Sequence, residues 1–436
     1  MSSVLLSPRT LECHFRSRPW LRALPIALMC SAMVAGLEGA RLALASALIH
    51  RGRFASLEMA LALDPANPEV ERKLGLFELY SSEDPNPLLA RRYLERAAQL
   101  SPRRPFYQSD LALACDALGD FSCADQALSE ALNLSPMTPH LYWLAANHDL
   151  RAGQPEKARP LFRRLLQLSP SYADATFDIC LRALNDPEQT LREVLPSGQN
   201  SDLKLRYVDF LAANGREDAA RQAWREAATP ASELSFALTK PYLEHLIDTG
   251  RYENARSVWQ DLERARAVPA PEPGNLVTNG GFEQTPLGAG FDWRYQPVPY
   301  TSADFEDPGA YRGVRCLRLD FTVAVNREFE PVSQFIPVES GAAYLLTAYV
   351  RSERITSDSG PRLRVRDPDC SSCLDAQSSA ALGTTGWHPV SLSFSASPRT
   401  RIVKLTVWRP RSRSFPAEIS GRFWLDDVSM GLLRNN

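Results

Sequence analysis

The chain has 436 residues, which exceeds the size at which one hydrophobic core normally keeps growing, so we expect at least two domains. Hydrophobic residues make up 44% and charged residues 23%, as in an ordinary globular protein. The formal net charge of -2 excludes a general attraction to nucleic acid, and we predict no nucleic-acid partner.

The amino terminus has the pattern of an exported protein. Residues 1–22 form a basic segment, and an uncharged apolar run from Ala23 to Leu37 follows, within a helix that we assign to 23–39. The run is short for a membrane span of about 20 residues, although flanking residues can extend it. An uncleaved anchor, a removed signal and a buried first helix remain open. The first two predict a single-pass protein of the bacterial inner membrane with its bulk in the periplasm, or secretion into the periplasm.

A repeat of 34 residues follows, within a segment that we assign to 40–266. The phrases QLSP and NLSP close successive units at Pro102, Pro136 and Pro170, and alanines and turn glycines recur at the same interval. In period, small residues and closing proline the segment resembles the tetratricopeptide repeat (TPR). The resemblance implies an all-α solenoid of about six helix pairs, irregular over 171–200, whose concave face binds a protein partner.

Two neighbouring units supply the candidate peptide groove. Positions on one side of their first helices carry polar and aromatic side chains: His140, Trp143, Asn147, Arg151, Phe106 and Ser109. The two aromatic residues of this set have an alternative role, because they can instead pack between neighbouring repeats.

The helical pattern ends in a proline-rich linker at 267–274, and short alternating segments over 275–436 then predict an all-β domain, an antiparallel sandwich or jelly roll. Within it, Cys370 and Cys373 form a single C-x-x-C pair without a second pair or flanking histidines. We therefore expect a loop disulfide there and not a zinc site.

The β domain carries scattered motifs of its own. NLVTNGGFE opens it at Asn275, FDW follows at Phe291, SQFIPVESGAAYLLTAYVR begins at Ser333, and FWLDDVSM closes it from Phe423. These motifs resemble the carbohydrate-binding jelly rolls of the galactose-binding-like superfamily. The resemblance implies glycan binding.

The same resemblance implies a structural calcium ion held by Glu283 and Asp426, with plain surface charge as the alternative. No other cofactor is predicted. Sugar recognition needs flat apolar surfaces and a few polar groups. The candidates are Trp293, Tyr295, Trp387, Trp408 and Arg409, and core packing is the alternative for each tryptophan.

No catalytic motif was found, since the six histidines are scattered and no zinc-protease, nucleophile-elbow or phosphate-loop pattern occurs. We predict that the protein is not an enzyme. Anchor, TPR stack and sandwich together resemble bacterial TPR proteins of exopolysaccharide or O-antigen assembly. The expectation is an envelope scaffold that binds a protein partner and polysaccharide; the alternative is an adaptor whose sandwich is sugar-blind and structural.

Overall fold

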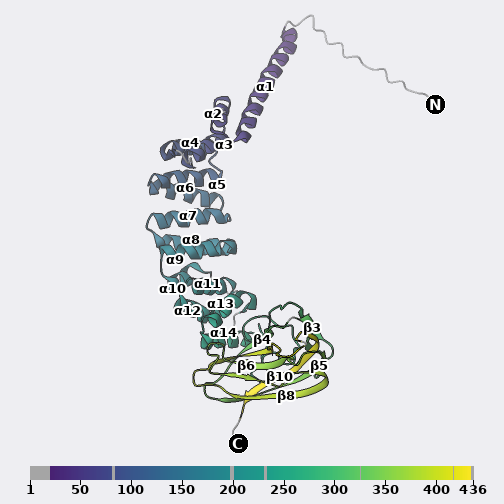
Figure 1. Ribbon diagram of the computed structural model, residues 1–436. Coiled ribbons are helices and arrows are strands. Elements are labelled where there is room, and N and C mark those ends of the chain that lie inside the picture. The colour runs from purple at the N-terminus through teal and green to yellow at the C-terminus, as the bar shows by residue number, and fades with distance from the viewer. Residues whose placement is uncertain are drawn as a thin grey trace, which may run out of the picture. The chain divides into compact units, whose positions relative to one another are not determined.

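The computed structural model describes residues 20–80, 84–196, 201–229, 233–324, 326–415 and 417–433, so most of the basic segment lies outside it. The chain divides into two compact units, Met1–Tyr172 and Ala173–Asn436. Figure 1 shows that helices form the earlier part of the chain and strands the later part. The predicted fold class, an α-solenoid followed by a β-sandwich, is confirmed.

The first unit consists of helices, and those that precede the closing prolines Pro102, Pro136 and Pro170 end at Leu100, Leu134 and Leu168. Many begin with proline, because the first helical position needs no N–H donor. Ala124 and Ala158 are fully buried where paired helices meet, and Gly119 and Gly153 take positive φ values of 72° and 71° at the turns. The helices are α1 (Trp20–Arg51), α2 (Phe54–Leu63), α3 (Pro68–Tyr80), α4 (Pro87–Leu100), α5 (Pro105–Ala117), α6 (Phe121–Leu134), α7 (Pro139–Arg151), α8 (Pro155–Leu168) and η1 (Pro170–Tyr172).

Helix α1 has two parts. The stretch Ala23–Arg51 is long and apolar enough to cross a membrane, and its large side chains from Leu24 to Leu44 are exposed. Further along the same helix, Ala45 and Leu48 are buried, and Leu48 packs in a core with α2 and α3. The helix therefore continues past residue 39 and supplies half of the first helix pair.

The second unit opens with more helix pairs. Its first segment is irregular, as the sequence indicated, and includes a very short helix and one π-helical turn. The helices are α9 (Ala173–Ala183), α10 (Pro187–Gln189), η2 (Thr190–Val194), α11 (Asp202–Ala213), α12 (Glu217–Ala227), α13 (Phe236–Asp248) and α14 (Tyr252–Arg264). When the irregular segment from α9 to η2 is left out, the described helices of both units form six pairs, the number that the period predicts.

Two antiparallel five-stranded sheets form the sandwich, in the orders β1-β4-β9-β6-β7 and β2-β3-β10-β5-β8. Their facing sides supply one apolar core, because alternate residues of each strand point inward. The strands are β1 (Arg294–Tyr295), β2 (Thr301–Asp307), β3 (Cys316–Ala324), β4 (Phe329–Pro337), β5 (Ala343–Ile355), β6 (Arg362–Arg366), β7 (Asp375–Gln377), β8 (Gly383–Ser395), β9 (Ile402–Arg409) and β10 (Ile419–Leu432).

Within the second unit, the loop before β1 packs on the last helix pair. Trp259 of α14 is buried, and its ring meets Phe291 edge to face with the centroids 5.8 Å apart. Glu244 of α13 accepts hydrogen bonds from the Gly290 amide at 2.7 Å and from the Arg294 guanidinium at 2.5 and 2.8 Å. A bidentate ion pair beside a buried aromatic contact fixes this loop on the helices.

Candidate functional site

Three aromatic side chains gather on the outer face of the sheet β2-β3-β10-β5-β8. The rings of Tyr311 and Tyr349 stack with centroids 3.6 Å apart and an interplanar angle of 11°, and the Trp387 ring lies 6.0 Å from Tyr311. Tyr311 is 43% exposed, so part of its surface is open to a ligand. We call Tyr311, Tyr349 and Trp387 the aromatic patch.

The alternation of β5 places Tyr349 in the patch. Tyr344, Leu346, Ala348 and Val350 belong to the core, so the residues between them lie on the opposite face. Tyr349 therefore lies on the outer face, where hydrogen bonding with its hydroxyl raises the pKa of Tyr311. The Tyr311 phenol is therefore a neutral hydrogen-bond donor at ordinary pH.

A second tryptophan, Trp424, lies in the sheet beside the patch. Trp424 of β10 is buried, its indole N–H donates to Asp307 at 3.3 Å, and the Arg351 guanidinium lies 4.4 Å from its ring centroid. Trp387 donates in turn to the Gly309 carbonyl at 3.3 Å. These contacts join the patch to the start of the loop that carries Tyr311.

Backbone hydrogen bonds to one buried carboxylate hold that loop. Asp426 of β10 accepts from the Tyr311 amide at 2.8 Å and from the Arg312 amide at 2.9 Å through the same oxygen, Oδ2. Burial raises the pKa of Asp426, and the amide donors oppose that rise. The carboxylate therefore fixes the main chain at the residue whose ring forms the patch.

A second carboxylate holds the far end of the loop. Glu283 Oε1 accepts from the Val314 amide at 2.8 Å and the Arg315 amide at 3.2 Å. Gly313 lies between these anchors with a φ of +78°, and a Cβ there would lie only 1.9 Å from Glu283 Oε1. Only glycine fits this position without displacing the carboxylate.

These contacts bear on the calcium ion that the resemblance implied. Calcium needs six to eight oxygen ligands, whereas the amide-bonded oxygens of Glu283 and Asp426 already face N–H groups, which repel a cation. Among the described residues, the two carboxylates belong to no group of three His, Cys, Asp or Glu ligand atoms within 4.8 Å. The arrangement fits loop anchoring and does not fit a calcium site.

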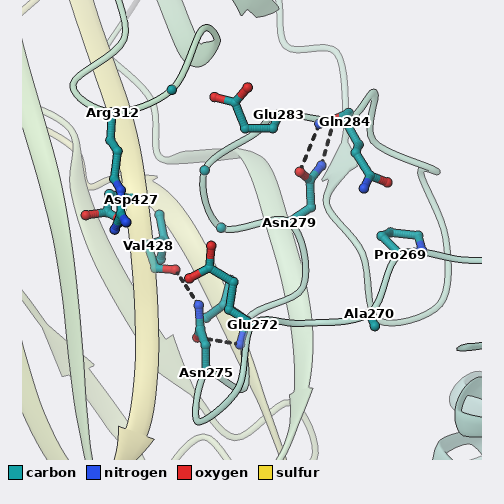
Figure 2. A pocket seen from close by; sticks show the side chains of 14 residues that line it. Pro269, Ala270, Glu272, Asn275, Asn279, Glu283, Gln284, Arg312, Asp427 and Val428 are labelled. Atoms are coloured by element: carbon teal, nitrogen blue, oxygen red, sulfur yellow. Dashed lines mark hydrogen bonds and ion pairs between the residues drawn. The ribbon is translucent and has the colours of Figure 1, made fainter.

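A pocket of about 300 Å³ lies beside Glu283. Figure 2 shows Arg312 and Asp427 close together on one side of it and the asparagines Asn275 and Asn279 along the segment that precedes β1. Asn275 donates to the Val428 carbonyl at 3.1 Å, so the asparagine holds this segment on β10. The pocket has a polar rim and no stacked aromatic surface.

The other predicted sugar-binding residues lie apart from Trp387. Trp293 is fully buried and stacks on Phe282 at 5.0 Å, so core packing is its role and it has no face for a sugar. Tyr295 is partly exposed, on β1, and lines a different pocket of about 420 Å³ together with Phe305.

The last two candidates belong to β9, in the other sheet. Trp408 is nearly buried, because the Arg364 guanidinium lies 4.3 Å from its ring centroid and its N–H donates to Glu328 at 2.7 Å. Arg409 is fully buried and donates to main-chain carbonyls, so it serves the sandwich and cannot contact a sugar. The prediction for Arg409 is wrong because its side chain points inward at a strand end.

In the first unit, the predicted groove residues divide into two groups. His140 and Arg151 of α7 are exposed, and Phe106 of α5 is 50% exposed. Ser109 is buried, and its hydroxyl donates to the Phe106 carbonyl at 3.1 Å, so it cannot line a groove.

The remaining two groove candidates are partly buried. Trp143 packs against Phe162 and Tyr172 with centroids 6.1 and 5.8 Å apart, which is the packing role left open for it. Asn147 donates to the Trp143 carbonyl at 2.7 Å within the same helix. Helical spacing predicted which residues share one face, and the structure shows that some of them are buried and cannot contact a ligand.

The structure contains two disulfide bonds among the described cysteines. One joins Cys370 and Cys373 in the loop between β6 and β7. The other joins Cys115 of α5 to Cys123 of α6, a pair that sequence alone could not distinguish from buried thiols.

Sequence reasoning missed Tyr311 and Tyr349 as site residues. The alternation in Tyr344–Arg351 was available and places Tyr349 outward. Tyr311 lies in an irregular segment after Pro308-Gly309, so no periodic signal indicated its position.

No family model matches this chain. Solved structures similar to it include MamA from AMB-1, 28% identical, with 27% of this chain and 66% of that chain covered and a TM-score of 0.24. A second MamA structure is 16% identical over 46% of this chain and 90% of its own length, with a TM-score of 0.27. A CBM4 structure is 11% identical over 36% of this chain and 99% of its own length, also with a TM-score of 0.27.

Proposed function

We propose that the protein is a non-enzymatic scaffold of the cell envelope that binds a protein partner through its helical repeats and glycan through its β-sandwich. The aromatic patch is the observation that supports glycan binding. Its stacked tyrosines and neighbouring indole give a flat apolar surface with phenol hydroxyls at its edge. That combination is what the recognition of a sugar ring requires.

Helix α1 supports the location in the envelope. Its apolar side chains between residues 23 and 44 are exposed, and an apolar face of this length is stable only when lipid or protein covers it. We assign α1 as an inner-membrane anchor with the bulk of the chain in the periplasm. A removed signal, with secretion into the periplasm, is the alternative. Exopolysaccharide or O-antigen assembly is the process we propose.

The protein partner is assigned to the first helices of the repeats. Tyr80 at the end of α3 and Phe106 at the start of α5 are more than one-third exposed, and exposed aromatic residues of this kind are enriched where proteins bind one another. Arg151 and His140 add polar contacts on α7.

Substitution of the patch tests the glycan assignment. In the full-length chain, we expect Tyr311→Ala and Trp387→Ala each to weaken glycan binding by about tenfold, because each removes a stacking face worth about 1 kcal/mol or more. Affinity electrophoresis through bacterial exopolysaccharides, after a glycan array has chosen the ligands, measures the change.

Tyr300→Ala is the matched control, because Tyr300 is 58% exposed outside the patch and its substitution should leave binding unchanged. Equal retardation of wild-type, Tyr311→Ala and Trp387→Ala proteins by a bound polysaccharide would remove the patch from the proposal.

One observation favours a second function for the sandwich. Trp259 and Glu244 of the last helix pair contact the loop before β1, so the sandwich covers part of that pair within the second unit. An adaptor with a sugar-blind, structural sandwich would need this contact alone. Absence of binding to any glycan by the folded full-length chain would leave that second function standing.

A further inference from the structure

A histidine and three aspartates form a cluster between helices α5, α6 and α7 of the first unit. His148 of α7 is buried, and each of its ring nitrogens faces a carboxylate. Its Nδ1 lies 2.5 Å from Asp116 Oδ1, and its Nε2 lies 3.1 Å from Asp125 Oδ1. Asp116 in turn pairs with Arg151.

The next residue on α7 is the unusual member of the cluster. Asp149 is only 5% exposed, yet among the described residues its carboxylate receives no hydrogen bond and forms no ion pair. Its ligand atom and those of Asp125 and His148 all lie within 4.8 Å of one another. A largely buried carboxylate without a hydrogen-bond donor among the described residues can take a cation as its partner.

We propose that Asp125, His148 and Asp149 bind a divalent first-row transition-metal ion, with Zn²⁺ as the best-fitting ion. One imidazole nitrogen and two carboxylates are ligands that zinc accepts, and three protein ligands leave a position for water. A mixed nitrogen and oxygen set is unsuited to calcium, which takes six to eight oxygen ligands.

The position of Asp116 supports this assignment. Metal-binding histidines usually donate their other ring N–H to a carboxylate, which fixes the tautomer and orients the ring. Asp116 at Nδ1 does this, so Nε2 is directed toward Asp125. A metal ion would bind through the Nε2 lone pair, in place of the contact between Nε2 and Asp125.

No basic side chain forms an ion pair with Asp149 among the described residues. Lys157 of α8 acts on Asp149 but forms no ion pair with it among the described residues, and Arg151 is engaged by Asp116. Asp125 and Asp149 therefore present two carboxylates to the position of the ion.

The repeat gives the site a structural role. Asp149 and Lys157 lie 34 residues after Cys115 and Cys123, the pair joined by a disulfide in the preceding repeat. A metal ion would connect α6 to α7 of the next repeat, whereas the disulfide joins α5 to α6 within one repeat.

Zn²⁺ alone is the probe for the test, added to chelator-treated full-length protein in detergent. We expect saturable binding in competition with a chromophoric chelator, and a rise in the unfolding temperature. Asp125→Asn and Asp149→Asn should each weaken binding by about a hundredfold or more, because each removes a ligand, and loss of a group that only orients a ligand already costs about tenfold to a hundredfold. Asp125 is a safe position for folding because its side chain is 46% exposed.

Glu130→Gln is the control, because Glu130 is exposed on the same helix α6 and outside the cluster. Asp149→Asn without metal should be at least as stable as the wild type, since it removes an unpaired buried charge. A folded wild-type chain that binds no Zn²⁺, or Asn variants that bind it as tightly as the Glu130→Gln control, would overturn the proposal.

Discussion

Gly290→Val should release the sandwich from the last helix pair and lower the stability of the second unit by about 3 kcal/mol or more. Gly290 has a φ of +61°, which a β-branched residue avoids. A Cβ there would also lie 2.4 Å from Trp259 Cζ3 and 2.7 Å from Leu243 Cδ2. Thermal unfolding measures the loss, and faster proteolysis within 267–274 reports the released contact.

Gly288→Val separates the two causes of this loss. Gly288 has a φ of +69°, but a Cβ there would meet nothing within 4 Å. This control therefore carries the backbone strain without the collision with Trp259, and we expect it to leave the 267–274 segment protected. Identical proteolysis and unfolding of the two variants would contradict the contact between loop and helices.

Arg409→Met should lower the free energy of unfolding by about 3 to 5 kcal/mol, because it leaves buried acceptors without a hydrogen-bond donor. The Arg409 guanidinium donates to the carbonyls of Ser359, Arg327 and Ala417 at 3.1, 3.0 and 2.8 Å. It also donates to the Ser357 hydroxyl at 3.2 Å. Methionine fills a similar volume but donates to none of these oxygens.

Urea unfolding of the full-length chain, followed by tryptophan fluorescence, checks this value. Arg399→Met, at an exposed arginine in the turn after β8, serves as the control and should change stability by less than about 0.5 kcal/mol. A loss for Arg409→Met as small as that of the control would mean that the buried network contributes little.

The repeats were predictable because each is defined by local contacts. Ala124 and Ala158 must be small where helices meet, and Gly119 must take a positive φ, so the residue types themselves carry the period. The end of the apolar segment was less clear, since no proline or turn separates residue 39 from residue 40. Helix α1 accordingly continues to Arg51.

The site was predictable only in part, because its position depends on contacts between distant residues. Strand alternation predicts an outward Tyr349, but the loop that carries Tyr311 is fixed by Asp426 and Glu283, 115 and 28 residues away. The inward rotation of Arg409 likewise depends on carbonyls from three separate segments. Motifs identified the two carboxylates, and the structure shows that both accept hydrogen bonds from the main chain of the loop that carries Tyr311.

The continuity of helix α1 has a consequence for partner binding under the membrane anchoring that we propose. The helix runs unbroken from its exposed apolar part to the buried Ala45 and to Leu48, which belongs to the first core. A flexible linker would allow a wide range of distances between a domain and its anchor, whereas a helix with a rise of 1.5 Å per residue keeps that distance fixed. The first repeats would then stay within a narrow range of distances from the bilayer. A membrane-bound partner would meet them at a high effective concentration, an advantage that a freely diffusing partner lacks.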